Sequence, residues 1–471
     1  MISPLVKQIL VASSIQMAAI SVGGLISYPN VLIHQLKSNN SMIDWDLETS
    51  SWIGSIHGLA GIPTILMPAF MQWKGRKLAF LISCAFVTIG WILAYVAKSV
   101  IFIFMSECFH GLGSNSVLIV SSCCMGEFID PNYRNTFMVT YFILQSMGIA
   151  GIGILGQYLH WKTISLMMLA PVIFSILNAC FVWPESPSWL SLKGRYKESE
   201  RSFQWLRGTN KRASEELMEI LSAHNKKVNK VSLIKRLTMR DFYIPAILMF
   251  VLLNMMYWGG VLVVMIYFQD IIEKATGNAT ASSYATIIMN VVLFICYNVC
   301  AILVRRFDTK SVLILSVLGT ILSALFVSLV TYIQSIYLIN RSFLCIYGLI
   351  AYIISCTLGL SSIVFSVGMD IMPVKHRDIG GGLYVIYTCI LHLTSMKAAP
   401  YMFVYLDLWR SFFIYALNAT VCLYIVWKYI PETKNRTLQE LEDYFTYGKF
   451  IKRDDADIVS PIFNESQGQG I

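Results

Sequence analysis

Charged side chains are scarce in this sequence. Asp, Glu, Lys and Arg make up 13% of its 471 residues, about half of the roughly 25% that is usual in soluble domains. Hydrophobic residues make up 56% of the sequence, a larger share than the core of an ordinary water-soluble fold requires. This composition excludes a disordered chain, a collagen-like chain and a disulfide scaffold, and it argues against a cytosolic enzyme.

Motifs of catalytic and cofactor sites are also missing. The sequence has no glycine-rich nucleotide-binding loop and no nucleophile constellation. His57, His110 and His392 lie in three separate apolar segments without metal-ligand spacing, which favours packing roles. The eleven Cys lie in or beside apolar segments and suggest no disulfide framework. We predict no enzymatic activity, no cofactor, no metal site and no nucleic-acid partner.

Long apolar runs, in contrast, are abundant. A membrane-spanning helix needs about 20 mostly apolar residues, and one polar segment divides the runs of this length into six plus six. We predict an all-α polytopic membrane protein with six-helix halves at 1–183 and 244–430, a linker with short amphipathic helices at 184–243, and a tail at 431–471. The twelve predicted spans are 9–29, 51–71, 78–97, 100–120, 136–157, 163–183, 244–268, 282–304, 311–332, 343–368, 380–404 and 409–430.

The positions of Lys and Arg indicate which ends of the spans face the cytoplasm. If both termini are inside, most of the 36 basic residues fall in cytoplasmic loops, as the positive-inside rule requires. This topology places the sequons at Asn39, Asn278 and Asn340 outside the cell, where glycosylation occurs. We therefore predict a multi-pass glycoprotein of the plasma membrane with both termini in the cytoplasm and the lipid bilayer as a partner.

Polar motifs recur in the same order at the cytoplasmic edges of the two halves. The spacing between the members of a pair is nearly constant, from 233 to 247 residues. We infer a duplicated six-helix unit, in which a site between the halves faces either side as the halves rock. The paired positions are Lys77 and Lys310, Glu127 and Asp370, Arg134 and Arg377, and Glu185 and Glu432.

Several of these motifs also carry a family resemblance. They are Ser51-Trp52-Ile53-Gly54-Ser55, Lys74-Gly75-Arg76-Lys77, Pro184-Glu185-Ser186-Pro187-Ser188-Trp189-Leu190, Lys193-Gly194-Arg195 and Pro431-Glu432-Thr433-Lys434-Asn435-Arg436-Thr437-Leu438. Together they resemble the sugar-porter branch of the major facilitator superfamily, and within it the insect facilitated trehalose transporters and their relatives. The resemblance covers roughly residues 10–445 and implies twelve helices, an intracellular helical segment in 190–240, and alternating access.

The resemblance also implies a charge network that latches the cytoplasmic side when that side is closed. The alternative is that these charges only fix topology and anchor helix ends. The chain departs from the family pattern here, since Thr309 stands where an Arg is usual. The implied network is Arg76, Glu127, Arg134 and Glu185 in one half, and Lys310, Asp370, Arg377 and Glu432 in the other.

The sugar site implied by the resemblance has lost nearly all its amides. Phe142 stands at the usual Gln of span five, and Met256 and Tyr257 replace a Gln pair in span seven. Gln145, three residues after Phe142 on the same helix face, offers a partial replacement. Each polar residue has an alternative role, because polar side chains in spans often bond a neighbouring helix. The candidate substrate-binding residues are Phe142, Gln145, Asn254, Tyr257, Phe365 and Thr388.

Glu107 is a rare acidic residue inside a span. The family usually has an Arg at this point, and Glu107 can either take up a proton or form a structural pair with Lys397 or a His. We favour the structural pair. Proton-coupled members of the family typically have an Asp in the first span, whereas Ser13 to Tyr28 contains no acid. Uniport is therefore favoured unless Glu107 has taken over the coupling.

These observations together favour a carrier for a small neutral solute. By resemblance, a sugar such as trehalose or glucose is the expected substrate, moved by facilitated alternating access through a monomer. Two alternatives remain at this point. The chain could carry a less polar, non-sugar solute, or it could be a non-transporting sugar sensor with a degenerate site.

Overall fold

The computed structural model describes most of the chain. Some of the positions discussed above lie outside the described residues: Asn39, Asn340, most of residues 210–237 in the predicted linker, nearly all of the C-terminal tail, and the side chains of Asp370 and Arg377. The described ranges are 3–37, 46–209, 238–337, 343–372 and 376–432, with the single positions 214, 217, 218, 441, 444 and 445.

The regular elements within these ranges are helices. The first part of the chain forms α1 (Pro4–Leu36), α2 (Leu47–Gly61), η1 (Ile62–Leu66), α3 (Met67–Lys74), α4 (Arg76–Val96), α5 (Val100–Phe128), α6 (Pro131–Leu155), α7 (Trp161–Val182), α8 (Pro187–Leu192) and α9 (Tyr196–Arg207). The second part forms α12 (Arg240–Tyr257), α13 (Val261–Thr276), α14 (Ala279–Arg306), α15 (Thr309–Tyr337), α16 (Leu344–Ser355), η3 (Cys356–Leu360), α17 (Ser361–Asp370), α18 (Arg377–Tyr405) and α19 (Asp407–Tyr429).

Twelve stretches of the described chain are long and apolar enough to cross a membrane, which confirms the twelve predicted spans. Local capping explains where several begin. The carboxylate of Asp46 accepts a hydrogen bond of 2.6 Å from the Thr49 N–H, one of the donors left unpaired at the start of α2. Three spans are interrupted, which hydropathy did not reveal: the second by the 3₁₀ turn η1, the seventh between α12 and α13, and the tenth by the π-helical turn η3.

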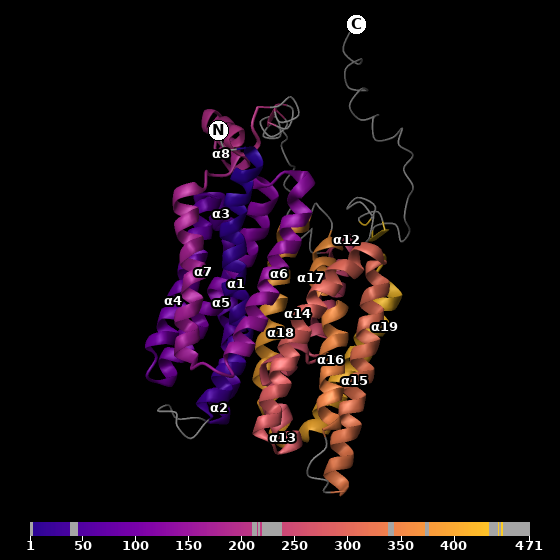
Figure 1. Ribbon diagram of the computed structural model, residues 1–471. Coiled ribbons are helices and arrows are strands. Elements are labelled where there is room, and N and C mark those ends of the chain that lie inside the picture. The colour runs from indigo at the N-terminus through magenta and orange to yellow at the C-terminus, as the bar shows by residue number, and fades with distance from the viewer. Residues whose placement is uncertain are drawn as a thin grey trace.

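The helices form two bundles that lie side by side (Figure 1). In the N-terminal half α1 packs on α6 and α7, and in the C-terminal half α15 packs on α19. The halves meet mainly where α2 and η1 pack on α18, α6 packs on α14, and α1 packs on α13. We call the end of the bundle where α1 begins, next to α8 and α9, the N-terminal face, and the end where α1 finishes the opposite face.

Small residues allow α1 and α6 to approach closely. A Cβ atom at Gly148 would lie 2.1 Å from the carbonyl oxygen of Ile20, and one at Gly23 would lie 2.0 Å from that of Gln145. Neither distance is possible for a real side chain, so both positions require glycine. This is the small-residue packing typical of membrane helices, and it fixes the backbone of α6 on which Gln145 lies.

Candidate transport site

The seventh span breaks near the middle of the molecule. Gly260 adopts a left-handed backbone with φ of 85°, and a Cβ there would lie 2.7 Å from the ring of Tyr415. The carbonyl of the preceding Gly259 accepts a 2.6 Å hydrogen bond from the Tyr352 hydroxyl. Chain breaks of this kind free backbone groups from the helix ladder, and transporter sites are typically formed around them.

A second break, in the tenth span, is stabilised by one serine. The hydroxyl of Ser316 on α15 accepts a 2.8 Å hydrogen bond from the Leu360 N–H and donates one of 2.6 Å to the Ser355 carbonyl. These contacts satisfy backbone groups at both ends of η3. Single π-helical turns are frequent at functional sites. The C-terminal half therefore supplies two irregular helices to the centre of the bundle.

Three predicted substrate-binding residues gather beside α18. The buried ring of Tyr257 lies 5.7 Å from the ring of His392, and Phe365 lies 6.2 Å from Tyr384. Tyr384 is also close to Tyr257, and Thr388 is one turn further along α18. The substrate role of these residues stays a prediction, but the fold brings them together from α12, α17 and α18.

The other three predicted residues are placed differently. Phe142, 54% exposed, and the half-buried Gln145 lie on α6 in the N-terminal half, which packs on α14 of the other half. Asn254 donates its amide hydrogens to Asn418 Oδ1 at 2.9 Å and to Cys422 Sγ at 3.4 Å, both on α19. Asn254 thus makes the contact with a neighbouring helix that is the alternative role for such a residue.

In the N-terminal half, the predicted charge network forms a compact cluster at the N-terminal face. Buried Arg76 makes a bidentate pair with Glu127, with Nε 2.9 Å from Oε2 and Nη2 2.8 Å from Oε1. Glu185 accepts hydrogen bonds at the start of α4, from the Arg76 N–H at 2.8 Å and the Lys77 N–H at 3.3 Å. Ser186 links the two acids by donating from its hydroxyl to Glu127. The carboxylate of Glu185 therefore caps a helix N-terminus.

The C-terminal half repeats the cap. Glu432 accepts from the Thr309 N–H at 3.2 Å and the Lys310 N–H at 3.0 Å, at the start of α15. The two lysines also correspond, because Lys310 Nζ donates to the Trp427 carbonyl at 2.8 Å and Lys77 Nζ to that of Trp183 at 2.9 Å. Each acid therefore caps one helix start and each lysine bonds the end of another, at positions where the motifs repeat in the sequence.

Arg134 makes a contact that the sequence did not suggest. Its Nη2 donates a 2.5 Å hydrogen bond to the Gly126 carbonyl near the end of α5. These contacts of Arg76, Glu127, Arg134 and Glu185 all join elements of the N-terminal half. The latch function of the network stays a prediction.

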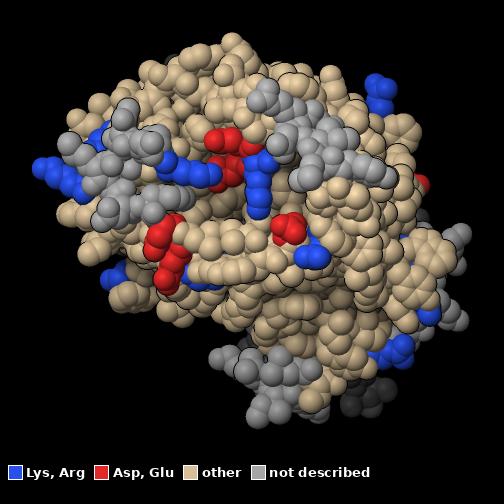
Figure 2. Space-filling model, turned by 90° about the horizontal axis from the view of Figure 1, so that it is seen from below, with Lys and Arg blue, Asp and Glu red and all other residues tan. Residues whose placement is uncertain are grey.

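At the opposite face, polar contacts cross between the halves. Lys37 Nζ lies 3.5 Å from Asp270 Oδ1, and Gln157 donates to Gln269 at 3.0 Å. Nearer the centre, the Tyr267 hydroxyl donates to the Ser50 carbonyl at 3.0 Å. Figure 2 shows this face, where acidic and basic side chains lie next to one another near its middle. The halves are therefore in direct contact at this end.

Glu107 is buried among histidines from three elements. Its Oε1 lies 3.4 Å from His110 Nδ1 on the same helix, and its Oε2 lies 3.9 Å from His57 Nδ1 on α2. The ring of His57 stacks on that of His392 from α18. Lys397, the other expected partner of Glu107, instead bonds Ser51 at 2.8 Å. A histidine partner for Glu107 was among the predictions, but the three histidines were not expected to lie together. Spacing along one chain does not show which helices become neighbours.

The family model described as "Sugar (and other) transporter" matches residues 9–445, nearly the whole chain. The chain belongs to this family. Membership supports a membrane carrier, as predicted from the sequence, and does not favour a non-transporting sensor.

Curated relatives of this transporter resemble it over most of their length. The facilitated trehalose transporter Tret1 of Apis mellifera ligustica is 24% identical over 444 residues, which cover 93% of this chain and 88% of that protein. The sugar transporter ERD6-like 8 of Arabidopsis thaliana is 26% identical over 403 residues, covering 83% of each.

Solved structures confirm the major facilitator fold. The proton:xylose symporter XylE bound to 6-bromo-6-deoxy-D-glucose superposes with a TM-score of 0.73 at 15% identity, over 94% of this transporter and 100% of that chain. The inward-open conformation of XylE from E. coli gives the same TM-score, over 93% and 99% of the two chains.

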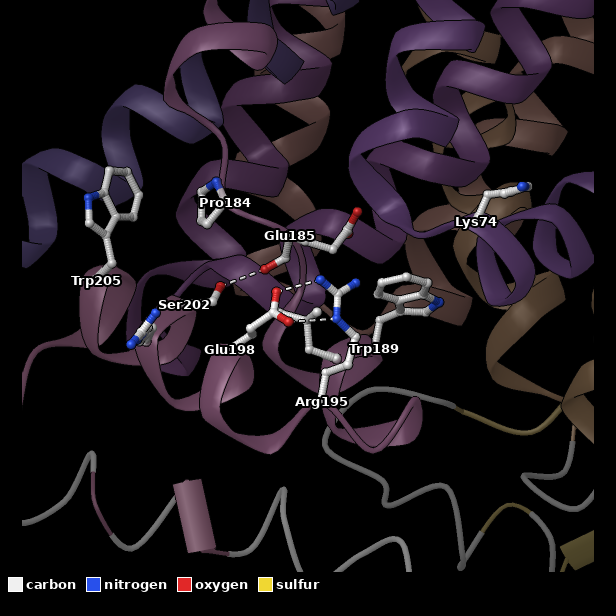
Figure 3. A pocket seen from close by; sticks show the side chains of 10 residues that line it. Lys74, Pro184, Glu185, Trp189, Arg195, Glu198, Ser202 and Trp205 are labelled. Carbon is white, nitrogen blue, oxygen red and sulfur yellow. Dashed lines mark hydrogen bonds and ion pairs between the residues drawn. The ribbon is translucent and has the colours of Figure 1, made fainter.

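One pocket of the transporter lies away from the interface between the halves. It has a volume of about 540 Å³ and lies between the end of α3 and helices α8 and α9 (Figure 3). Arg195 and Glu198 pair on its wall at the start of α9, and Ser202 donates to the Glu185 carbonyl at 2.5 Å. Trp189 also lines it, with its Nε1 bonded to the Gln72 carbonyl at 3.0 Å. These contacts attach α8 and α9 to the N-terminal half, so we assign this pocket to the linker and not to the transported solute.

Proposed function

We propose that this transporter moves a neutral sugar, with trehalose and glucose as the first candidates, across the plasma membrane by alternating access. The observation that carries the proposal is how the halves meet. Lys37–Asp270 and Gln157–Gln269 join them at the opposite face, whereas the Arg76–Glu127 pair at the N-terminal face closes within one half. Closure at one end by contacts of this modest strength suits a carrier whose halves must separate there in each cycle.

The basic N-terminal face supports an orientation in which this end is cytoplasmic. Arg76, Lys77, Lys310 and the linker lie at this end, and such loops face the cytoplasm in most membrane proteins. The opposite face is then extracellular. Asn278 is exposed there at the start of α14, where it is available for glycosylation. In this orientation both termini are cytoplasmic, and one chain with both halves is a complete monomeric carrier.

Sugar binding would use polar groups from both halves. A sugar leaving water needs partners for its hydroxyls, because an unmet buried polar group costs about 1–3 kcal/mol. Gln145 on α6 can provide an amide, and Tyr257 and Thr388 can provide hydroxyls. Phe142 and Phe365 offer flat apolar surfaces for the sugar ring. We leave Asn254 out of this set because its amide is bonded to Asn418.

Uptake of labelled trehalose and glucose into proteoliposomes tests the proposal. We expect saturable uptake by the wild type, and a half-saturation concentration raised by roughly fivefold to 100-fold in Gln145→Ala, which loses one hydrogen-bonding group. Gln204→Ala is the matched control, since this exposed amide on α9 bonds Glu200 and lies outside the bundle. Absence of uptake of both sugars by correctly folded protein would remove them as substrates.

A further inference from the structure

A carboxylate and three imidazoles lie together in the interior of the transporter. Glu107 and His110 are 1% and 0% exposed, and both belong to α5. His57 comes from α2, and His392 comes from α18 in the other half. A carboxylate inside a membrane bundle is costly, and such residues usually have a functional role.

Two fully buried atoms of this cluster have no hydrogen-bond partner within the described structure. They are Oε2 of Glu107 and Nε2 of His110. Oε2 lies 3.9 Å from His57 Nδ1, which is close enough for charge attraction but too long for a hydrogen bond. A buried pair that served only packing would be expected to have its polar atoms satisfied. One carboxylate oxygen and one imidazole nitrogen of this cluster are therefore available to bind a proton or to form a new hydrogen bond.

The charge balance of the cluster depends on one proton. The other titratable groups near it are hydroxyls and thiols, which are neutral in their ordinary range. With neutral imidazoles the ionised Glu107 leaves a net charge of minus one, one added proton neutralises the cluster, and a second would place two cations close together. These neighbouring groups are Tyr28 on α1, Cys108 on α5, Tyr257 on α12 and Cys389 on α18.

The cluster also bridges the two halves. The rings of His57 and His392 stack with their centroids 5.7 Å apart and an angle of 13° between planes. Nε2 of His392 lies 3.2 Å from the Gly54 carbonyl on α2, a second contact across the same interface. The side chain of His57 remains 13% exposed, against 1% for Glu107. His392 is also partly exposed, but His57 is the one of the two that lies next to Glu107, so a proton from solvent can reach the carboxylate through it.

We propose that Glu107, His57, His110 and His392 form a proton-binding site, and that the transporter carries one proton together with each sugar. This rests on the proposed function. A proton from one aqueous side binds to Glu107 or to an adjacent imidazole, which makes the cluster neutral and permits the closed state. When the halves separate at the other side and water reaches His57, the proton leaves to that side. The sugar undergoes no chemical change, and one proton disappears from one compartment as one appears in the other.

Two flux measurements in proteoliposomes test this with labelled trehalose and glucose as probes. Exchange at equal pH on both sides reports sugar binding and rocking, whereas accumulation under an inward proton gradient reports coupling. At one proton per sugar, we expect accumulation by up to about tenfold for each pH unit of gradient. A protonophore should abolish it. Glu107→Gln cannot bind the proton, so its flux under a gradient should equal its flux without one.

Controls separate coupling from folding. Glu48→Gln makes the same acid-to-amide change on α2, at a carboxylate that bonds Trp52, and should keep the gradient response. If Glu107→Gln does not fold, His57→Gln removes the partly exposed imidazole next to Glu107. This variant should also lose the sugar accumulation that the proton gradient drives. Accumulation that persists in a folded variant of either residue overturns the proposal. Wild-type exchange without any response to the gradient also overturns it and leaves the carrier function standing.

If neither sugar is exchanged, the proposed function fails and the proton site is judged without transport. Gain or loss of this proton changes the charge buried in the bundle, so the melting temperature of the wild type should contain a component that depends on pH. Glu107→Gln stays neutral and should lack this component. Identical pH profiles for the two proteins would overturn the proton site.

Discussion

The two halves of the transporter use the same device at their N-terminal face but surround it differently. Glu185 caps α4 as Glu432 caps α15. Arg76, however, adds a buried bidentate pair with Glu127, and the corresponding position in the second half is Thr309. The second half instead contains the broken helix α12–α13, whereas α1 runs without a break from Pro4 to Leu36. The repeat thus preserves the helix caps, while the N-terminal half adds the Arg76–Glu127 pair and the C-terminal half contains two of the three interrupted spans.

The largest effect should follow from removing Arg76. Arg76→Ala leaves Glu127, whose side chain is 17% exposed, without its bidentate partner, and breaking a buried pair costs about 3–5 kcal/mol. We expect a fall of several degrees in the melting temperature of the purified protein. Thr309→Ala at the equivalent position removes no ion pair and should change it much less. Equal effects at the two positions would mean that the halves are not asymmetric in this way.

The break in the seventh span gives the second prediction. Gly260→Ala must place a Cβ at φ of 85° and 2.7 Å from the Tyr415 ring, so we expect a loss of about 1–3 kcal/mol. Thermal unfolding measures the loss. The double variant Gly260→Ala with Tyr415→Leu relieves the contact but not the backbone strain, and should recover only part of it. Full stability of Gly260→Ala would show that the break is not fixed by this glycine.

Much of this architecture could be predicted from the sequence, and the limits have physical causes. Spans and halves follow from hydropathy, which is a local property. Glu185 and Glu432 were named from the repeated motifs and the family resemblance, but their role as helix caps became visible only in the structure. The contact of Glu107 with His57 depends on which helices pack together, and the Asn254–Asn418 bond depends on helix rotation. The apolar pattern of a single span shows neither which helices pack next to it nor how that helix is rotated about its axis.

Neutralising the caps sharpens the comparison between the halves. Glu185→Gln and Glu432→Gln both remove the negative charge at a helix start, worth about 0.3–2 kcal/mol in partly buried sites. Ser186 connects Glu185 to the Arg76–Glu127 pair, since its N–H donates to Glu185 at 2.9 Å and its hydroxyl to Glu127. In the second half, Thr309 stands at the position of Arg76. We therefore expect the larger fall in melting temperature from Glu185→Gln. A larger fall from Glu432→Gln would place the more important cap in the second half.

The smallest effect concerns the linker helices α8 and α9, which pack on α5 and α1 of the N-terminal half. The Leu206 carbonyl of α9 accepts a 3.0 Å hydrogen bond from Gln8, and Arg195 bonds the exposed Glu198. The bond from Arg195 lowers the pKa of Glu198, so its stabilising contribution is present above the unfolded-state pKa of about 4.3 and is lost as the pH falls through the folded value. Arg195→Ala should thus differ slightly from the wild type in protease resistance of the linker at neutral pH. The difference should vanish on acidification, whereas a difference that persists in acid would assign Arg195 a role independent of Glu198.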